Sequence, residues 1–257
     1  MSLICCRHSG IMKYDWRDAG EEWSERWGTS AAQWSETILP RIKDCLPAPT
    51  ILEIGPGYGR WTHYLKDQCE RLVVVDRSAE CIEACRTRFA TDPRVTGYVN
   101  EGGSLPMISD GSVDFVFSFD VFVHIKREVV EQYLSEFSRT LKPGGRGFIH
   151  HSNLGAYANS ARNFIPSGLK KLLTKWHVLD EDHHRTPTMS AQLFRTLCGE
   201  HGLRCTRQEL VNWRGRRLID CFSWFRRDEA ARDQPTEIIR NPHFMREAAA
   251  VRQQSGR

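Results

Sequence analysis

The sequence lacks features that would place the protein in a membrane or in an oxidising compartment. No apolar run approaches membrane-spanning length, and the opening stretch, MSLICCRHSG, is too short in apolar residues for a signal peptide. The nine cysteines form no CxxC pair and have no matching histidine pair at metal-ligand spacing. We therefore expect reduced thiols in a soluble, cytoplasmic protein that binds no membrane.

The chain also has no internal repeat, no low-complexity tract and no dense basic run interleaved with aromatic residues. Its net charge of +4 is mild, and much of it comes from scattered arginines between residues 204 and 252. Such arginines are typical of solvated surfaces, although a basic face could also hold an anionic small molecule. We expect no nucleic-acid partner, and the composition leaves a homodimer open.

What is present is a regular alternation of apolar strands and amphipathic helices, which starts near residue 50. Strands are predicted at 51–54, 71–76, about 95–100, 112–120 and 146–151, with helices between them. Because most of these strands are apolar throughout, they indicate a parallel sheet that is covered on both faces. Two further strands, RCTRQELVNW and RLIDCFSWFRR, are joined by RGR and predict a final hairpin.

The flanking segments differ from this core in composition. Residues 1–46 contain a stretch rich in tryptophan and acid, which indicates an N-terminal helical extension or lid. Residues 47–227 form the main domain, in which polar residues 152–190 indicate an insertion that caps the active site. Residues 228–257 form a charged tail that we expect to be partly disordered.

Three glycines lie in five positions directly after the first strand, in ILEIGPGYGR. At the carboxyl end of a parallel strand, glycine permits positive φ and lets a ligand approach the backbone N–H groups. The spacing is GxGxG, not the GxGxxG of dinucleotide sites, because position 60 is Arg60. Asp76 ends the second strand, where a carboxylate can accept hydrogen bonds from ribose hydroxyls. A tight turn followed by a surface aspartate is the structural alternative.

The segments ILEIGPGYGRWTHYL, VVVDRS, GSLPMISDGSVDFVFSFDVFVHI and LKPGGRGFIHHSN together resemble the class I S-adenosylmethionine-dependent methyltransferases of the small-molecule branch. The resemblance covers residues 50–152 and extends more loosely to 227. It implies an α/β fold, a Rossmann-like three-layer sandwich with a seven-stranded, mostly parallel sheet whose last strand is antiparallel. It also implies S-adenosylmethionine as the cofactor.

The resemblance assigns the cofactor site residue by residue. The glycine loop would cradle the methionine portion above Glu53, Asp76 would hold the ribose, and two residues of the fourth strand would pass close to the sulfonium. Family members often have an aspartate before a small residue after the third strand, and this chain has glutamate there. The implied cofactor residues are Glu53, Gly55, Gly57, Gly59, Asp76, Glu101, Gly102, Ser118 and Phe119.

Candidates for acid–base chemistry follow the fourth and fifth strands. A hydroxyl acceptor loses a proton as it attacks the methyl group, so a base with a near-neutral pKa helps, whereas an amine needs little more than alignment. Asp120 and His124 lie at the methyl end, although a histidine such as His124 can simply cap a helix. His150 and His151 face opposite ways on one strand, and His151 is preferred because it is nearer the strand's end.

The acceptor is predicted less directly. The stretch FIHHSNLGAY resembles a subgroup of bacterial glycan- and sugar-modifying methyltransferases, which favours a sugar or glycan hydroxyl as acceptor and O-methylation as the reaction. Trp16, Trp23, Trp27 and Trp34 could stack on sugar rings or pack the N-terminal helices onto the core. The alternatives are N-methylation of a small amine and a cofactor-binding scaffold without turnover.

Two further chemistries are considered and not adopted. No metal site is predicted, although LDEDHHR (179–185) has side chains that could hold a divalent cation and acidify a hydroxyl. Nucleic-acid methylation is disfavoured because FDVFVH stands where an Asn/Asp-Pro-Pro-aromatic signature would present a flipped base.

Overall fold

The computed structural model describes residues 16, 18–158, 169, 173, 176, 182–213, 215–228 and 235–255. Most of the predicted cap insertion at 152–190 lies outside the described residues. So do the first fifteen residues of the N-terminal extension. The proposed domain limits at 1–46, 47–227 and 228–257 therefore stay predictions.

One mixed sheet of eight strands organises the described chain, in the order β3-β2-β1-β4-β5-β7-β6-β8. β1 to β5 run parallel, β7 is antiparallel to both β5 and β6, and β8 is parallel to β6. The strands are β1 (Thr50–Ile54), β2 (Arg71–Asp76), β3 (Val95–Val99), β4 (Val113–Phe122), β5 (Leu141–Ser152), β6 (Arg204–Val211), β7 (Asp220–Arg226) and β8 (Glu237–Asn241).

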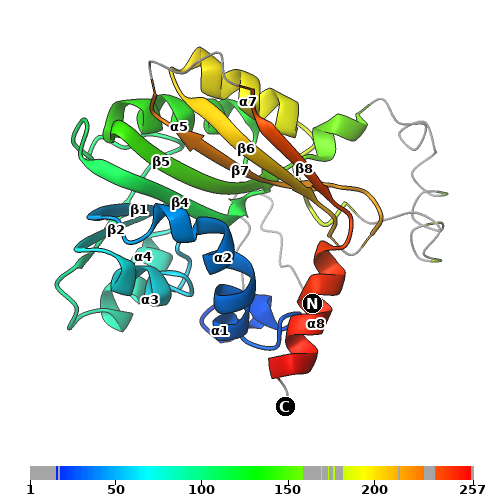
Figure 1. The fold of residues 1–257 in the computed structure, drawn as a ribbon. Helices are drawn as coiled ribbons and strands as arrows, with labels where there is room; N and C mark the ends of the chain where they lie inside the picture. The colour runs from blue at the N-terminus through cyan, green and yellow to red at the C-terminus, as the bar shows by residue number, and fades with distance from the viewer. Residues whose placement is uncertain are drawn as a thin grey trace.

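Helices cover both faces of this sheet, which confirms the Rossmann-like sandwich (Figure 1). One face carries α5 and α7, and the other carries α1 to α4 and α8 (Figure 1). The α-helices are α1 (Ser30–Gln33), α2 (Leu39–Ile42), α3 (Thr62–Leu65), α4 (Ala79–Arg88), α5 (Arg127–Thr140), α7 (Ala191–Glu200) and α8 (Phe244–Ser255). Shorter 3-10 or π turns are η1 (Glu21–Ser24), η2 (Trp34–Ile38), η3 (Lys43–Cys45), η4 (Lys66–Gln68) and η5 (Leu154–Tyr157).

The two-residue period of a strand divides the core into two apolar clusters. Ile51 and Phe117 face the cluster beneath α1, α2 and α8, whereas Leu52 and Val116 face the cluster beneath α5 and α7. In β5, Phe148 belongs to the first cluster and Ile149 to the second. The next two residues of β5, which are histidines, must therefore also face opposite sides of the sheet.

The predicted final hairpin is confirmed, because β6 and β7 pair antiparallel, from Arg204 opposite Arg226 to Val211 opposite Asp220. β7 inserts between β5 and β6, so it is the antiparallel strand of a sheet that otherwise runs one way. The eighth strand was not predicted. It adds to the outer edge of β6 and does not alter the order of the other seven.

The described part of the C-terminal tail, which was expected to be partly disordered, contains β8 at residues 237–241 and α8 at residues 244–255. α8 packs its Phe244 ring against Trp27, Trp213 and Phe222, and Phe244 is fully buried. The sequence analysis missed this helix because the tail is highly charged. Only a few apolar residues, such as Phe244 and Ala248, pack it against the core.

The helices and the cysteines of the described residues bear on the predicted absence of membrane spans and of disulfides. No helix there combines the length and the apolar character needed to span a bilayer. The seven cysteines in the described part of the chain are all free thiols, as expected for reduced cysteines.

Replacing Phe244 with alanine should lower the free energy of unfolding by about 3–5 kcal/mol, because it empties a buried site that three aromatic rings line. Urea denaturation measures this change. Ile238→Ala on β8 is the matched control, since Ile238 is 51% exposed and should change stability by less than about 0.5 kcal/mol. An unchanged midpoint for Phe244→Ala would mean that α8 does not dock in solution.

Candidate functional site

The loop between β1 and α3 requires glycine at all three predicted positions. Gly55, Gly57 and Gly59 have φ values of 73°, 56° and 85°, in the left-handed region that L side chains rarely adopt. A Cβ at Gly55 would lie 2.4 Å from Val121, one at Gly57 2.4 Å from the Trp16 ring, and one at Gly59 2.5 Å from Phe89. The loop therefore has both the conformation and the close packing that exclude a side chain.

Glu53 lies beneath this loop as a buried carboxyl group. Its Oε2 accepts a hydrogen bond of 2.6 Å from Thr62 Oγ1, while Oε1 is buried without a hydrogen-bond partner in the described part of the chain. Burial raises the pKa of Glu53 to about 8, although the Thr62 hydrogen bond and the Arg60 charge act to lower it. At neutral pH the carboxyl group is therefore largely protonated, with one oxygen still unsatisfied.

Asp76 lies at the end of β2, beside the glycine loop. The N–H of Gly55 donates to the carbonyl of Val75 at 2.8 Å, which holds the loop against the neighbouring strand. One carboxylate oxygen of Asp76 accepts from the N–H of Ser78 at 2.9 Å, and burial raises the Asp76 pKa. The backbone at the start of α4 thus orients the carboxylate, and Asp76 ends β2 as the sequence predicted.

The remaining cofactor candidates lie just after β3 and within β4. Glu101 is exposed just after β3, and Gly102 has a φ of 60°. Buried Ser118 donates to the carbonyl of Ile54 at 2.8 Å, so it ties β4 to the start of the glycine loop, and Phe119 is 3% exposed beside it. Sequence reasoning missed Asn100, whose Nδ2 donates to the carbonyls of Gly102 and Ser104 and to Tyr133, and thereby shapes the turn.

Asp120 is the most distorted residue of β4. Its φ is 66°, which is uncommon for a non-glycine residue and costs on the order of 1–2 kcal/mol. Its side chain is 19% exposed and is held by partners on both carboxylate oxygens: Oδ2 accepts from Arg60 Nη2 at 3.2 Å, and Oδ1 lies 3.2 Å from His150 Nδ1. Although burial opposes ionisation, His150 and Arg60 lower the pKa of Asp120 to about 2.

His150 is fully buried between two carboxylates. Its Nδ1 accepts from the backbone N–H of Asp120 at 3.3 Å, and its Nε2 lies 3.2 Å from Asp220 Oδ2. The rings of Phe119, Trp213 and Phe222 surround the imidazole. Burial acts to lower the pKa of His150, but Asp120 and Asp220 together outweigh it and raise the pKa.

The far end of this arrangement is a buried ion pair. Asp220 is fully buried and accepts two hydrogen bonds from Arg185, at 2.9 and 2.7 Å, which is bidentate geometry. Although burial opposes its ionisation, Arg185 and His150 hold the pKa of Asp220 well below its usual range. Arg185 also lies over the ring of Trp213, with its guanidinium carbon 4.8 Å from the ring centroid.

Five groups therefore form a charge chain, in the order Arg60, Asp120, His150, Asp220 and Arg185. Sequence reasoning found its centre and missed Asp220 and both arginines. Two signals could have indicated them: an aspartate inside the apolar run LIDCF, and an arginine where dinucleotide loops have glycine. Neither signal identifies the partner, because Arg60 is 60 residues from Asp120 and Arg185 is 35 residues from Asp220.

His151 faces the opposite side of the sheet, away from the charge chain. Its ring stacks on Phe194 with centroids 4.3 Å apart, Nδ1 is 2.9 Å from the Ser152 carbonyl oxygen, and Nε2 is 2.8 Å from Ser223 Oγ. Burial lowers the pKa of His151 to about 4. The alternation of side chains along β5 thus brings His150, and not the preferred His151, next to Asp120.

His124 lies outside the charge chain, and its Nδ1 is 2.9 Å from the carbonyl oxygen of His184. Of the acidic and histidine side chains at 180–184, which were considered for a cation but not predicted to bind one, Asp180 and Glu181 lie outside the described residues. Within the described ranges, no group of three or more His, Cys, Asp or Glu side chains could hold a metal ion.

The N-terminal segment covers the glycine loop. Trp16 stacks on Tyr58 with ring centroids 4.6 Å apart, and its ring contacts the bare backbone of Gly57. Trp27 and Trp34 are buried in the core beneath the sheet, whereas Trp23 is 36% exposed. Trp27 and Trp34 therefore pack helices onto the core, which was the structural alternative to stacking on a sugar.

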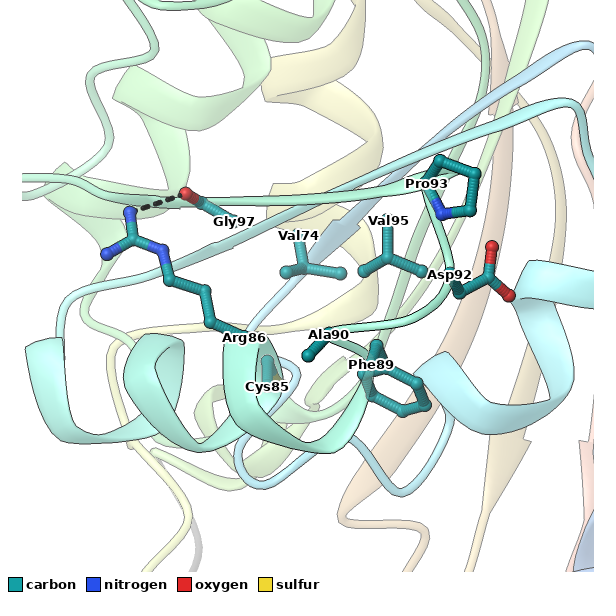
Figure 2. A pocket seen from close by; sticks show the side chains of 9 residues that line it. All are labelled: Val74, Cys85, Arg86, Phe89, Ala90, Asp92, Pro93, Val95 and Gly97. Carbon is teal, nitrogen blue, oxygen red and sulfur yellow. Dashed lines mark hydrogen bonds between the residues drawn. The ribbon is translucent and has the colours of Figure 1, made fainter.

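A hollow of about 260 Å³ lies elsewhere, between the end of α4 and the strands β2 and β3 (Figure 2). Figure 2 shows mostly apolar side chains around it, together with Arg86, which donates to the carbonyl of Gly97, and Asp92. No residue of the charge chain lines this hollow. We interpret it as incomplete packing between helix and sheet.

Comparison with known proteins gives two kinds of similarity in sequence. Residues 51–145 match the family model described as a methyltransferase domain. The chain is 27% identical over 181 residues to the biotin biosynthesis bifunctional protein BioHC of Cellvibrio japonicus, a match that covers 68% of this chain and 32% of that protein. It is 26% identical over 161 residues to phosphoethanolamine N-methyltransferase 1 of Triticum aestivum, covering 61% and 29%. The chain thus spans about a third of these relatives' lengths.

Solved structures show the same fold at low sequence identity. A SAM-dependent methyltransferase from Aquifex aeolicus superposes with a TM-score of 0.53 at 15% identity, over 83% of this chain and 98% of that one. The N-methyltransferase NodS from Bradyrhizobium japonicum gives a TM-score of 0.53 at 15% identity, over 80% and 98%. These similarities confirm the α/β methyltransferase fold.

S-adenosylmethionine fits the residues at the strand ends. The glycine loop turns through three residues with positive φ at the end of β1, the buried Glu53 has an unsatisfied oxygen beneath it, and Asp76 lies at the neighbouring strand end. These features suit the methionine backbone and the ribose hydroxyls of the cofactor. The assignment of individual cofactor contacts stays a prediction.

Asp76→Asn should weaken binding of S-adenosylhomocysteine about tenfold or more, because a charged acceptor of hydroxyl hydrogen bonds becomes neutral. Isothermal titration calorimetry measures the affinity. Asp110→Asn, whose side chain is 78% exposed, is the control and should bind like the parent protein. Equal affinity in both variants would contradict the role assigned to Asp76.

Glu53→Gln should remove a pH-dependent loss of stability. The folded-state pKa of about 8 exceeds the unfolded value of about 4.3, so the folded protein holds an extra proton between these values. The free energy of unfolding of the parent should therefore fall as pH rises from about 4.5 to 8, and the variant should lack that component. Urea denaturation at pH 5, 7 and 8.5 tests this, with exposed Glu83→Gln as the control. Parallel pH profiles for parent and Glu53→Gln would contradict the raised pKa.

Proposed function

We propose that the protein is a class I S-adenosylmethionine-dependent methyltransferase that methylates a hydroxyl group of a small polar molecule, on the premise that residues 51–145 match a methyltransferase domain. The observation that carries the proposal is the buried His150, held between Asp120 and Asp220 at the strand ends beside the glycine loop. An acid–base group of this kind serves a hydroxyl acceptor, which must lose a proton, more than an amine acceptor.

Only one member of this trio can touch a substrate. His150 and Asp220 are fully buried, whereas the Asp120 side chain is 19% exposed. Asp120 is therefore the catalytic residue of the proposal: its carboxylate accepts a hydrogen bond from the acceptor hydroxyl and aligns that oxygen for attack. His150 acts through Asp120, so it is a positioning residue that also receives the proton.

The proton balance explains why both groups are needed. S-adenosylmethionine, when bound, supplies an activated methyl group on sulfur. When the acceptor hydroxyl takes up the methyl group, its proton would pass to the Asp120 carboxylate and on to His150 Nδ1, which balances the charge. Because His150 and Arg60 hold the pKa of Asp120 near 2, its carboxylate keeps the proton poorly, whereas the imidazolium is stabilised by carboxylates on both sides.

A sugar or glycan hydroxyl is the specific acceptor that we propose to test first, from the likeness of residues 148–157 to sugar-modifying methyltransferases. The tryptophans give this choice little support, because Trp27 and Trp34 are buried in the core. A screen of sugars, sugar nucleotides and small alcohols with isotope-labelled cofactor, with and without magnesium, would identify the acceptor.

N-methylation of a small amine is the second candidate. It is favoured by the wheat relative, which is named for N-methylation of phosphoethanolamine. The ionised Asp120 could hold an amine as well as a hydroxyl. The two candidates differ in their need for a proton acceptor, so a screen that includes amines and the His150 variant distinguishes them.

His150→Gln should lower kcat for a hydroxyl acceptor by about a hundredfold or more and spare binding of S-adenosylhomocysteine, because the proton acceptor is lost and the glycine loop is untouched. Single-turnover rates with labelled cofactor and calorimetry measure the two effects. His151→Gln is the matched variant from the other face of β5. It should lower stability but keep the rate per folded molecule within about threefold. A full rate in His150→Gln would refute the proton route, and equal losses in both variants would refute the distinction between the histidines.

A further inference from the structure

Arg60 follows the last glycine of the loop and reaches from the cofactor side of the site to the acceptor side. We propose that Arg60 is a positioning residue for Asp120, and that its own position is set by docking of the N-terminal segment through Ser24. The N-terminal segment is defined here as residues 16 and 18–29. This inference deepens the proposed function and rests on it for the role of Asp120.

The Arg60 guanidinium is fixed on three sides. Its Nη2 donates to Asp120 Oδ2 at 3.2 Å, its Nη1 donates to Ser24 Oγ at 3.2 Å, and its plane lies over the Trp61 ring with 4.3 Å between the guanidinium carbon and the centroid. The side chain is 8% exposed. A buried arginine is costly unless its donors are satisfied, so these contacts define one position for the group.

Arg60 and His150 share one carboxylate. Asp120 Oδ2 contacts Arg60 and Asp120 Oδ1 contacts His150, so the fixed charge of Arg60 competes with the titratable imidazole for the same negative group. The shared geometry also holds Asp120 in its left-handed conformation, which an unsupported aspartate would leave. Arg60 thereby controls both where the carboxylate points and how strongly His150 holds a proton.

Within the described chain, Asp120 and Asp220 are the charged groups that face His150 directly. Arg185 acts on the imidazole from behind Asp220, as Arg60 does from behind Asp120. The remaining neighbours are the rings of Phe119, Trp213 and Phe222, which carry no titratable group. A substitution of Arg60 should therefore change the pKa of His150.

The N-terminal segment supplies the other anchor of Arg60. Ser24 is fully buried at the end of η1. Gly20 has a φ of 90°, and a Cβ placed on it would lie 3.8 Å from the Cβ of Arg60. Trp16, from the same segment, lies on Tyr58 and Gly57 of the glycine loop. The segment thus contacts the glycine loop and also orients the arginine that reaches Asp120, so it links the two sides of the site.

The test follows the titration of His150 by NMR of the full-length, ligand-free protein, with the ring signals assigned by their loss in His150→Gln. Arg60→Gln should raise the pKa of His150 by about 1 unit, because a nearby positive charge is removed and Asp120 is released to the imidazole. Arg60→Lys keeps the charge but cannot bridge Ser24 and Asp120, so it should give an intermediate shift. Arg86→Gln, an exposed arginine on α4, is the matched control and should leave the titration unchanged.

Ser24→Ala tests whether the hydrogen bond from Arg60 to Ser24 positions the arginine. It also tests the proposal if Arg60→Gln fails to fold. It removes one hydrogen bond and leaves both charges in place, so it should shift the pKa of His150 in the same direction by a smaller amount, about 0.3 unit. With an acceptor in hand, Arg60→Lys and Ser24→Ala should lower kcat several-fold while KM for S-adenosylmethionine stays within about twofold.

An unchanged His150 titration in both Arg60→Lys and Ser24→Ala would overturn the proposal, as would a wild-type titration in folded Arg60→Gln. Failure of the proposed function is seen separately. If the parent protein does not bind S-adenosylhomocysteine by calorimetry, the methyltransferase assignment fails, whereas the ligand-free titration still decides whether Arg60 controls Asp120 and His150.

Discussion

A buried imidazole between two carboxylates is the constraint on which the rest of the candidate site depends. Removing one partner from such a group costs several kcal/mol, because an uncompensated charge stays buried. Each carboxylate is therefore paired outward with an arginine, Asp120 with Arg60 and Asp220 with Arg185. The alternation of charge lets the chain accept one proton at its centre while each carboxylate keeps an arginine partner. This is the property that a proton acceptor for a hydroxyl substrate needs.

The fold explains why this charge chain lies beside the glycine loop. In a parallel sheet the carboxyl ends of the strands meet at one edge, so β1, β4 and β5 deliver the loop, Asp120 and His150 to neighbouring positions. The antiparallel β7 enters from the opposite direction, and its first residue, Asp220, therefore lies at the same edge, opposite Ser152. Inserting one reversed strand next to β5 thus supplies the second carboxylate.

The segments around the sheet edge hold the outer ends of the charge chain. The N-terminal segment contacts Arg60 through Ser24, and the residues after 182 supply Arg185, which packs on Trp213 from the β6–β7 turn. α8 supports Trp213 and Trp27 from beneath, so the C-terminal helix stabilises the same region. Three segments that are far apart in the sequence thereby stabilise a single site.

The sequence by itself determined the elements whose signals are local: the alternation of strands and helices, the three glycines that positive φ requires, Asp76 at a strand end, and the opposite orientation of His150 and His151. It could not decide which histidine faces Asp120, because that choice depends on the register of β5 against β4 and β7. Arg60 pairs with Asp120 across 60 residues of chain, and Arg185 pairs with Asp220 across 35. The reason is that periodicity and turn chemistry act between near neighbours, whereas the pairing of buried charges is set by the packing of distant segments.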